Sequence, residues 1–290
     1  MTPDRRFAPP RPRTLDEVFD KGRPQVSKSP GRCIFCSGYR LTKERVFPNW
    51  LRVLFPRSDS TTHTQGLIDW PIGPGATKME PAITTQTKPG HSGTRKVRVV
   101  CQKCNGGWMS ALEAQAKPLL LPLINGENGK ISVEAQRVLA TWASKTVMTA
   151  EFIHPKSAVI EVQERKLLME HLLPPERWHV WMARYEGEVW RGLSMYQHSG
   201  TLDVPSVSRP GGVSHYVEST TFGIGHVVFY VVATTWERIH IPFLGFGVPG
   251  LARICPAPNL DIVWPPPFIL GDAEVTRMSQ SVGEILLSKT

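Results

Sequence analysis

Four of the five cysteines fall into two Cys-x-x-Cys pairs, Cys33/Cys36 and Cys101/Cys104. Four thiolates are the number that a closed tetrahedral zinc site needs, and each pair can form a tight turn that places both sulfurs on one metal ion. The pairs are separated by 64 residues, whereas the usual zinc-finger interval is about 15–20. One shared zinc therefore requires a long insertion that returns to the metal.

Two other interpretations of these cysteines stay open. The pairs could be unrelated to each other, or one could be a redox Cys-x-x-Cys. The identical spacing of the two pairs and the lack of a thioredoxin-like βαβ context favour zinc over both. Cys255 has no such partner and is expected to be a buried structural thiol.

The residues around the second pair predict regular structure. A β-branched run over 97–100 precedes Cys101, and a helix-like stretch covers 108–117, with Pro118 and Pro122 expected to end that helix. We call the tight turn of each Cys-x-x-Cys pair a knuckle. The order knuckle, strand, second knuckle and helix indicates a zinc-stapled treble-clef module.

Charge is distributed unevenly along the 290 residues, whose net charge is +9. Residues 33–124 hold twelve Lys/Arg against five Asp/Glu, whereas residues 125–290 carry a net charge of −2. A basic module joined to a near-neutral domain fits a phosphate-backbone partner, although a solvated basic surface is an equally good interpretation of charge alone. No secretory signal or membrane-spanning run is seen, and few cysteines favour a reducing cytoplasm.

Three regions are expected. Residues 1–31 form a largely disordered basic arm, and residues 32–124 form the zinc module, with a long loop over 57–96 that has at most short strands. Residues 130–290 form an α+β domain of mixed helices and antiparallel strands. Its helices are expected after Ser132, within 161–172 and after Asp272 as N-cap, and its strands at 178–185, 188–196, 219–222, 226–234 and 238–243. Gly223 and Gly225 predict a bend or bulge.

The segments CIFC, LTKERVFPNWL and VRVVCQKCNGGWMSALE, within residues 33–117, resemble the zinc-stapled HNH (ββα-metal) endonuclease-like proteins of bacteria and their phages. The resemblance implies a structural Zn²⁺ on the four cysteines and a catalytic Mg²⁺ or Mn²⁺. Glu44 falls at the acidic metal-ligand position of that family, and Asn105 at its final metal-ligand position. The position of the general-base histidine holds Arg45, and the central Asn position holds Lys96.

Arginine cannot lose its proton near neutral pH, so Arg45 cannot act as a general base. In one interpretation the chain is a nuclease whose base is His91 or His63 from the long loop. In a second it keeps zinc and nucleic-acid binding but has lost cleavage. In a third the module is a structural or protein-interaction element. The expected partner is nucleic acid, DNA rather than RNA, contacted by basic residues around the knuckles: Arg40, Lys43, Arg45, Arg95, Lys96, Arg98 and Lys103.

Overall fold

The computed structural model describes residues 31–55, 62–69, 82–89, 95–155, 158–206, 209–235, 249–257 and 259–288. The fold is α+β, with helices and antiparallel sheets, as the sequence predicts. The predicted basic arm, apart from Gly31, and the predicted strand at 238–243 lie outside the described residues. None of the helices in the described ranges is both long and apolar enough to cross a membrane.

The main sheet has five antiparallel strands in the order β10-β6-β9-β8-β7. These strands are β6 (Trp178–Arg184), β7 (Leu193–Ser206), β8 (Arg209–Ile224), β9 (Val227–Thr234) and β10 (Ala252–Cys255). Every residue of β9 is buried, because helices cover both faces of the sheet at its centre. Gly225 begins the two-residue turn between β8 and β9 with a positive φ of 58°, which agrees with the predicted bend. Gly223 instead lies within β8, where it pairs with Ser194 and Val228.

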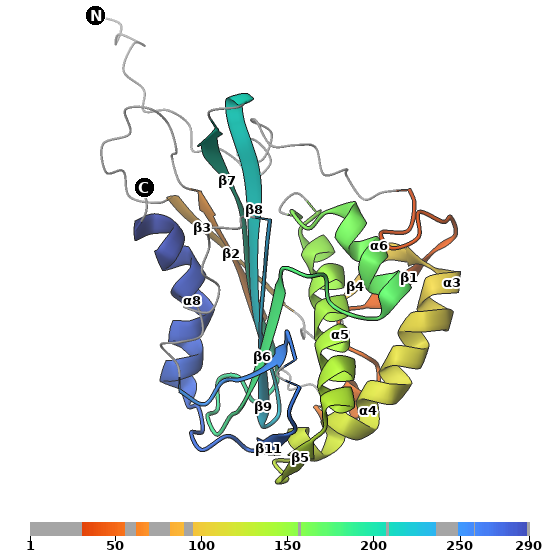
Figure 1. The fold of residues 1–290 in the computed structure, drawn as a ribbon, viewed down its shortest axis with the longest axis vertical. Coiled ribbons are helices and arrows are strands. Elements are labelled where there is room, and N and C mark those ends of the chain that lie inside the picture. Colours follow the sequence, from red (N-terminus) through yellow and green to blue (C-terminus); the bar gives the residue numbers. More distant parts are fainter. Residues whose placement is uncertain are drawn as a thin grey trace, which may run out of the picture.

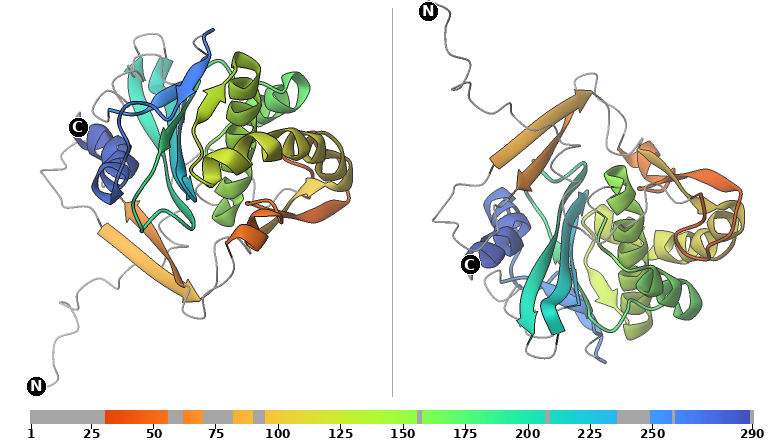
Figure 2. Two further views of the ribbon diagram at one scale, coloured as in Figure 1. Left: turned by 90° about the horizontal axis from the view of Figure 1, so that it is seen from below. Right: turned by 90° about the horizontal axis from the view of Figure 1, so that it is seen from above.

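Helix α5 (Val133–Ala150) lies against one face of the sheet, and α8 (Asp272–Ser288) lies against the other (Figures 1 and 2). The Ser132 side chain caps α5, as predicted, by accepting a hydrogen bond from the Ala135 amide at 3.2 Å. The other helices and strands lie mostly beyond α5: β1 (Leu41–Arg45), α2 (Leu51–Leu54), β4 (Lys96–Cys101), α3 (Gln102–Cys104), η3 (Asn105–Met109), α4 (Ser110–Ile124), β5 (Gly129–Ile131), η4 (Glu151–Ile153), α6 (Val162–His171) and β11 (Ile262–Trp264).

One hydrophobic core joins the cysteine segments to the main sheet. The ring of Phe47, which follows β1, packs edge-on against Phe222 of β8 with centroids 6.2 Å apart, and Trp142 of α5 packs against the same phenylalanine at 6.0 Å. Buried side chains continue from Cys33 through α4 and α5 to the sheet without a break. A second cluster on the opposite face of the sheet packs under α8 and includes the stacked pair Trp181 and Tyr230.

Helix α4 differs from the prediction, because it continues through Pro118 and Pro122 to Ile124. The two prolines are one turn apart, so they occupy the same side of the helix. Each proline lacks the N–H that would donate a helical hydrogen bond, so the carbonyls of Ala114 and Pro118 lose their helical donors. Both of these residues are exposed, so water can hydrogen-bond to their carbonyls instead. The opposite side of the helix buries an apolar row that stabilises it: Leu112, Ala116, Leu120, Leu123 and Ile124.

Two further predictions need correction. The segment 57–96, predicted as a loop with at most short strands, contains the eight-residue strands β2 (Thr62–Asp69) and β3 (Ala82–Pro89), paired antiparallel. Asp272 does not act as the N-cap of α8. Its carboxylate instead accepts hydrogen bonds from the amides of Glu188 and Val189 and from the Tyr185 hydroxyl, so it ties the helix to the loop before β7.

Candidate metal centre

The four cysteine sulfurs converge at one point. The Sγ atoms of Cys33, Cys36, Cys101 and Cys104 all lie within 4.8 Å of one another, and those of Cys36 and Cys101 are 3.4 Å apart. Zinc at about 2.3 Å from each of four tetrahedral sulfurs would place the sulfurs about 3.8 Å apart. The cluster could therefore hold a metal ion such as zinc, as the two Cys-x-x-Cys pairs predict.

Backbone hydrogen bonds shape the first knuckle. The amide of Ser37 donates to the Cys33 carbonyl at 2.9 Å, and the amide of Cys33 donates to the Gly38 carbonyl at 2.7 Å. Ser37 has a left-handed φ of 57°, which closes this tight turn. The Gly38 amide points at the Cys36 sulfur at 3.4 Å, a contact that favours a thiolate.

The second knuckle begins where β4 ends. Cys101 pairs with Leu41 of β1, and the Gln102 amide donates to the Arg40 carbonyl at 3.2 Å. The Cys104 amide points at the Cys101 sulfur at 3.5 Å. Pairing of β1 with β4 thus brings the end of the first knuckle beside the start of the second, which is why cysteines so distant in sequence can share one site.

The thiols interact strongly with one another. A hydrogen bond from Cys104 lowers the pKa of Cys33 to about 4, and the same interaction raises the pKa of Cys104. This interaction favours the thiolate form of Cys33 over that of Cys104. A bound divalent cation would extend this by favouring the thiolate form of all four.

The sheet of β1 and β4 presents an exposed cationic face beside the cysteines. Arg45 pairs directly with Lys96, while the inward-facing neighbours Glu44 and Val97 pair with each other. The pairing of β1 with β4 has a register irregularity between Thr42 and Glu44. Burial shows which residues face outward: Lys43, Lys96 and Arg98 are exposed and Arg45 is half-buried, whereas Glu44 and Val97 are buried. We call Lys43, Arg45, Lys96 and Arg98 the cationic face. Within the described chain, none of the four forms an ion pair.

The remaining predicted contact residues divide into two groups. Arg40 and Lys103 are exposed and line a pocket of about 330 Å³ with Tyr39 and Gln102. Arg95 is half-buried, and burial lowers its pKa. Its carbonyl accepts a hydrogen bond from the Val46 amide at 3.2 Å, so its backbone extends the pairing of β1 with β4.

Glu44, the predicted acidic metal ligand, is only 7% exposed and lies on the inward side of β1. Burial raises the pKa of Glu44, and the nearby Lys145 ammonium opposes that shift. Lys145 is fully buried on α5 and forms an ion pair with Glu113 of α4 at 2.8 Å. Sequence patterns did not single out Glu113 or Lys145, since each follows the ordinary charge pattern of its helix.

The other predicted catalytic residues are not gathered into one site by the described contacts. Asn105 is half-buried, and its amide nitrogen donates to the Thr42 hydroxyl at 2.9 Å. His63 lies in β2, and His91 falls outside the described residues. Among the side chains that the structure describes, the four cysteines are the one group of three or more Cys, His, Asp or Glu arranged to hold a metal.

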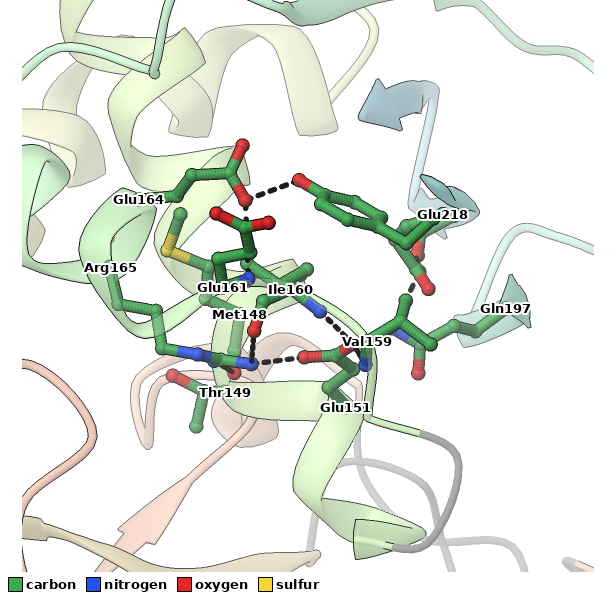
Figure 3. A network of polar contacts seen from close by, with 12 residues as sticks. Met148, Thr149, Glu151, Val159, Ile160, Glu161, Glu164, Arg165, Gln197 and Glu218 are labelled. Carbon is green, nitrogen blue, oxygen red and sulfur yellow. Dashed lines mark hydrogen bonds and ion pairs between the residues drawn. The ribbon is translucent and has the colours of Figure 1, made fainter. Parts of the chain in front are cut away.

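A second polar cluster, which the sequence analysis missed, lies between α6 and the main sheet (Figure 3). Arg165 forms an ion pair with Glu151, and the Tyr216 hydroxyl donates to Glu164. Glu218 of β8 is completely buried and accepts hydrogen bonds from Gln197 and Thr220 through Oε1. Burial raises the pKa of Glu218 well above 4.5, with a further contribution from Glu151.

Cys255 stands apart from the cluster. It is half-buried, its sulfur lies 3.6 Å from the Trp178 carbonyl oxygen, and burial raises its pKa to about 11. The raised pKa disfavours the reactive thiolate form of Cys255 at neutral pH.

Comparison of the chain with protein-family models, with curated proteins and with solved structures finds no match in any of the three.

Proposed function

We propose that this chain is a zinc-stabilised nucleic-acid-binding protein, with the four cysteines holding a structural Zn²⁺ and DNA as the expected partner. The observation that carries this proposal is the cationic face, with Arg45 directly opposite Lys96 and with Lys43 and Arg98 beside them. Like charges placed directly opposite each other across strands destabilise a sheet. A row of phosphates would offset that repulsion and release counterions from the nucleic acid.

The order of elements supports an HNH-like, treble-clef interpretation of residues 32–124. The first knuckle leads into β1, β4 leads into the second knuckle, and a helix follows. In such a module, zinc would hold the two strands at a constant distance and so keep the cationic face rigid. Rigid placement of charges lowers the entropy that is lost when they contact a partner.

Binding without cleavage fits the side chains better than nuclease activity does. The general-base position holds Arg45, which stays protonated. The candidate metal ligand Glu44 is on the inward side of β1, opposite to the cationic face, and is electrostatically coupled to Lys145. A carboxylate in this place is turned away from phosphates bound over Lys43 and Arg45.

Fluorescence anisotropy with labelled DNA at a series of salt concentrations tests this function. We expect measurable binding at low salt and a logarithmic salt slope of about −0.9 for each phosphate contacted in duplex. The double substitution Lys96→Glu and Arg98→Glu should abolish most binding. Arg137→Glu with Arg277→Glu, which makes the same charge change at exposed positions on α5 and α8, should leave most of it.

Two outcomes would contradict the proposal. If neither duplex nor single-stranded nucleic acid binds at low salt, the cysteine module is a scaffold or a protein-interaction element. If both double variants weaken binding equally, the net charge of the protein, rather than the cationic face, is responsible for nucleic-acid binding. Circular dichroism and zinc content, measured on each variant, confirm that the fold is retained.

A further inference from the structure

The pocket of about 330 Å³ between the two knuckles is lined by one aromatic, one amide and two cationic side chains. Its four residues are Tyr39 and Arg40 from the end of the first knuckle and Gln102 and Lys103 from the second. The Tyr39 side chain is 66% exposed, and the Arg32 guanidinium lies over its ring, 4.9 Å from the centroid. The exposed part of this ring is an aromatic surface that a ligand could contact.

The lining groups match the parts of one nucleotide. An exposed tyrosine ring can stack on a nucleobase, because every base has a π-face. The side-chain carboxamide of Gln102 can both donate a hydrogen bond to a base edge and accept one from it. Arg40 and Lys103 supply the positive charges that a flanking phosphate requires. Arg32 over Tyr39 adds a third cation and a second planar group for stacking.

The pocket lies at one end of the strand pair that carries the cationic face. Arg40 immediately precedes β1, and Lys103 follows the last residue of β4 by two positions. Arg45 and Lys96 lie at the opposite end of the same pair of strands. From Arg45 to Arg40 the chain extends over roughly 17 Å at 3.3 Å for each strand residue, so a nucleic-acid strand could contact the cationic face and the pocket together.

We propose that this pocket binds an unstacked nucleotide, and that the chain therefore prefers single-stranded nucleic acid over duplex. This inference rests on the proposed function and specifies its substrate class. In a duplex both faces of each base are covered by neighbouring pairs, so Tyr39 has no base to stack on. In a single strand a base can turn into the pocket while adjacent phosphates contact Arg40 and Lys103.

Zinc should be needed for this pocket. The backbone N–H of Gln102 donates a hydrogen bond to the Arg40 carbonyl, so one lining residue from each knuckle is joined to the other. Tyr39 and Lys103 each lie within three residues of a cysteine of the cluster. Separation of the knuckles would divide the lining into halves that could not contact one nucleotide together.

The test compares labelled oligothymidylate with a duplex of the same length, on the full chain loaded with zinc. We expect the single strand to bind more tightly than the duplex. Tyr39→Ala should weaken binding to the single strand about 10-fold, because stacking on one aromatic side chain contributes about that much. Tyr39→Phe, which keeps the ring and removes the hydroxyl, should bind the single strand as the wild type does.

The roles of Arg40 and Lys103 are tested separately, through the salt dependence of binding. Arg40→Ala with Lys103→Ala should lower the salt slope for the single strand by about 0.7 for each phosphate that the variant no longer neutralises. The salt slope for the duplex should change less, because duplex is expected to use the cationic face. Zinc content measured on each variant shows that the neighbouring cysteines still hold the metal.

The failures of the two proposals are distinguishable. If single strand and duplex bind equally and Tyr39→Ala has no effect, while Lys96→Glu with Arg98→Glu still weakens binding, the pocket inference is overturned and the proposed function stands. If no nucleic acid binds at low salt, both are overturned. If Tyr39→Phe weakens binding as much as Tyr39→Ala, the ring does not stack on a base, and the inference also fails.

Discussion

The sulfur atoms of Cys36 and Cys101 lie 3.4 Å apart, although the two residues are 65 positions apart in the sequence. Closing a loop of that length costs conformational entropy, and a weak contact between two thiols cannot offset this cost alone. Strand pairing between β1 and β4 and the shared hydrophobic core help to offset it. A metal on the four sulfurs would supply the largest single contribution, since structural zinc contributes about 10–16 kcal/mol in zinc-finger peptides.

We therefore expect one zinc ion for each chain and a strong dependence of stability on it. Cys101→Ser should abolish stoichiometric zinc binding and unfold the cysteine module, since the contribution of zinc is comparable to the whole stability of a typical domain, about 5–15 kcal/mol. Elemental analysis and thermal unfolding with and without a chelator measure both effects. Cys255→Ser is the matched control and should keep the zinc. A Cys101→Ser variant with unchanged stability would show that no metal is bound.

Lys145 is expected to be essential for stability. The ammonium is fully buried, pairs with Glu113 at 2.8 Å and is electrostatically coupled to the buried Glu44. Lys145→Met leaves both carboxylates without their cation, so the free energy of unfolding should fall by about 3–5 kcal/mol in urea denaturation. Lys166→Met is the control, because the pair of Lys166 with Glu170 is exposed and 3.7 Å long. Its removal should change stability by less than about 0.5 kcal/mol. Equal effects of the two substitutions would contradict this prediction.

Glu218 should make the protein less stable as pH rises. The pKa of this carboxyl is raised well above 4.5 in the folded protein by burial, so the folded chain holds a proton that the unfolded chain releases above that pH. Stability then falls with increasing pH, by up to about 1.4 kcal/mol for each pH unit until the folded pKa is reached. Glu218→Gln keeps both hydrogen bonds accepted through Oε1 and removes the titration.

The variant Glu218→Gln should thus be about as stable as wild type near pH 4 and more stable near pH 8. Urea denaturation at several pH values measures the difference. If the two pH profiles run parallel between pH 5 and pH 8, Glu218 is ionised in the folded state and its burial is compensated by contacts with cations.

Metal-dependent cleavage is expected to be absent. General-base assistance contributes about 10²–10⁴-fold to such a reaction, and Arg45 cannot provide it. Plasmid nicking in Mg²⁺ and in Mn²⁺ is the measurement. Arg45→His should restore activity only if Glu44 can reach the metal, which its burial disfavours. Robust cleavage by the wild type that is lost in His91→Ala or His63→Ala would instead identify a relocated base.

Features that depend on local chemistry could be predicted from the sequence alone. The cysteine cluster follows from two matched Cys-x-x-Cys turns, whose geometry is set within a few residues. Helix α5 follows from its 3.6-residue apolar period and from Ser132, a residue that caps helices by a contact with its own third neighbour. Strands β6 and β9 follow from their apolar, β-branched and aromatic composition.

Other features depend on partners far away in the sequence, so only the tertiary structure decided them. Glu44 turns inward and Arg45 outward because of the register of β1 on β4, and Glu44 lies near Lys145 because α5 packs behind that sheet. Helix α4 continues through two prolines because its apolar side is buried by other elements. Glu218 can remain in the core because Gln197 on β7 and Thr220 on β8 satisfy one of its oxygens. In each case the free energy comes from contacts that no local pattern encodes, because burial and pairing are properties of the assembled fold.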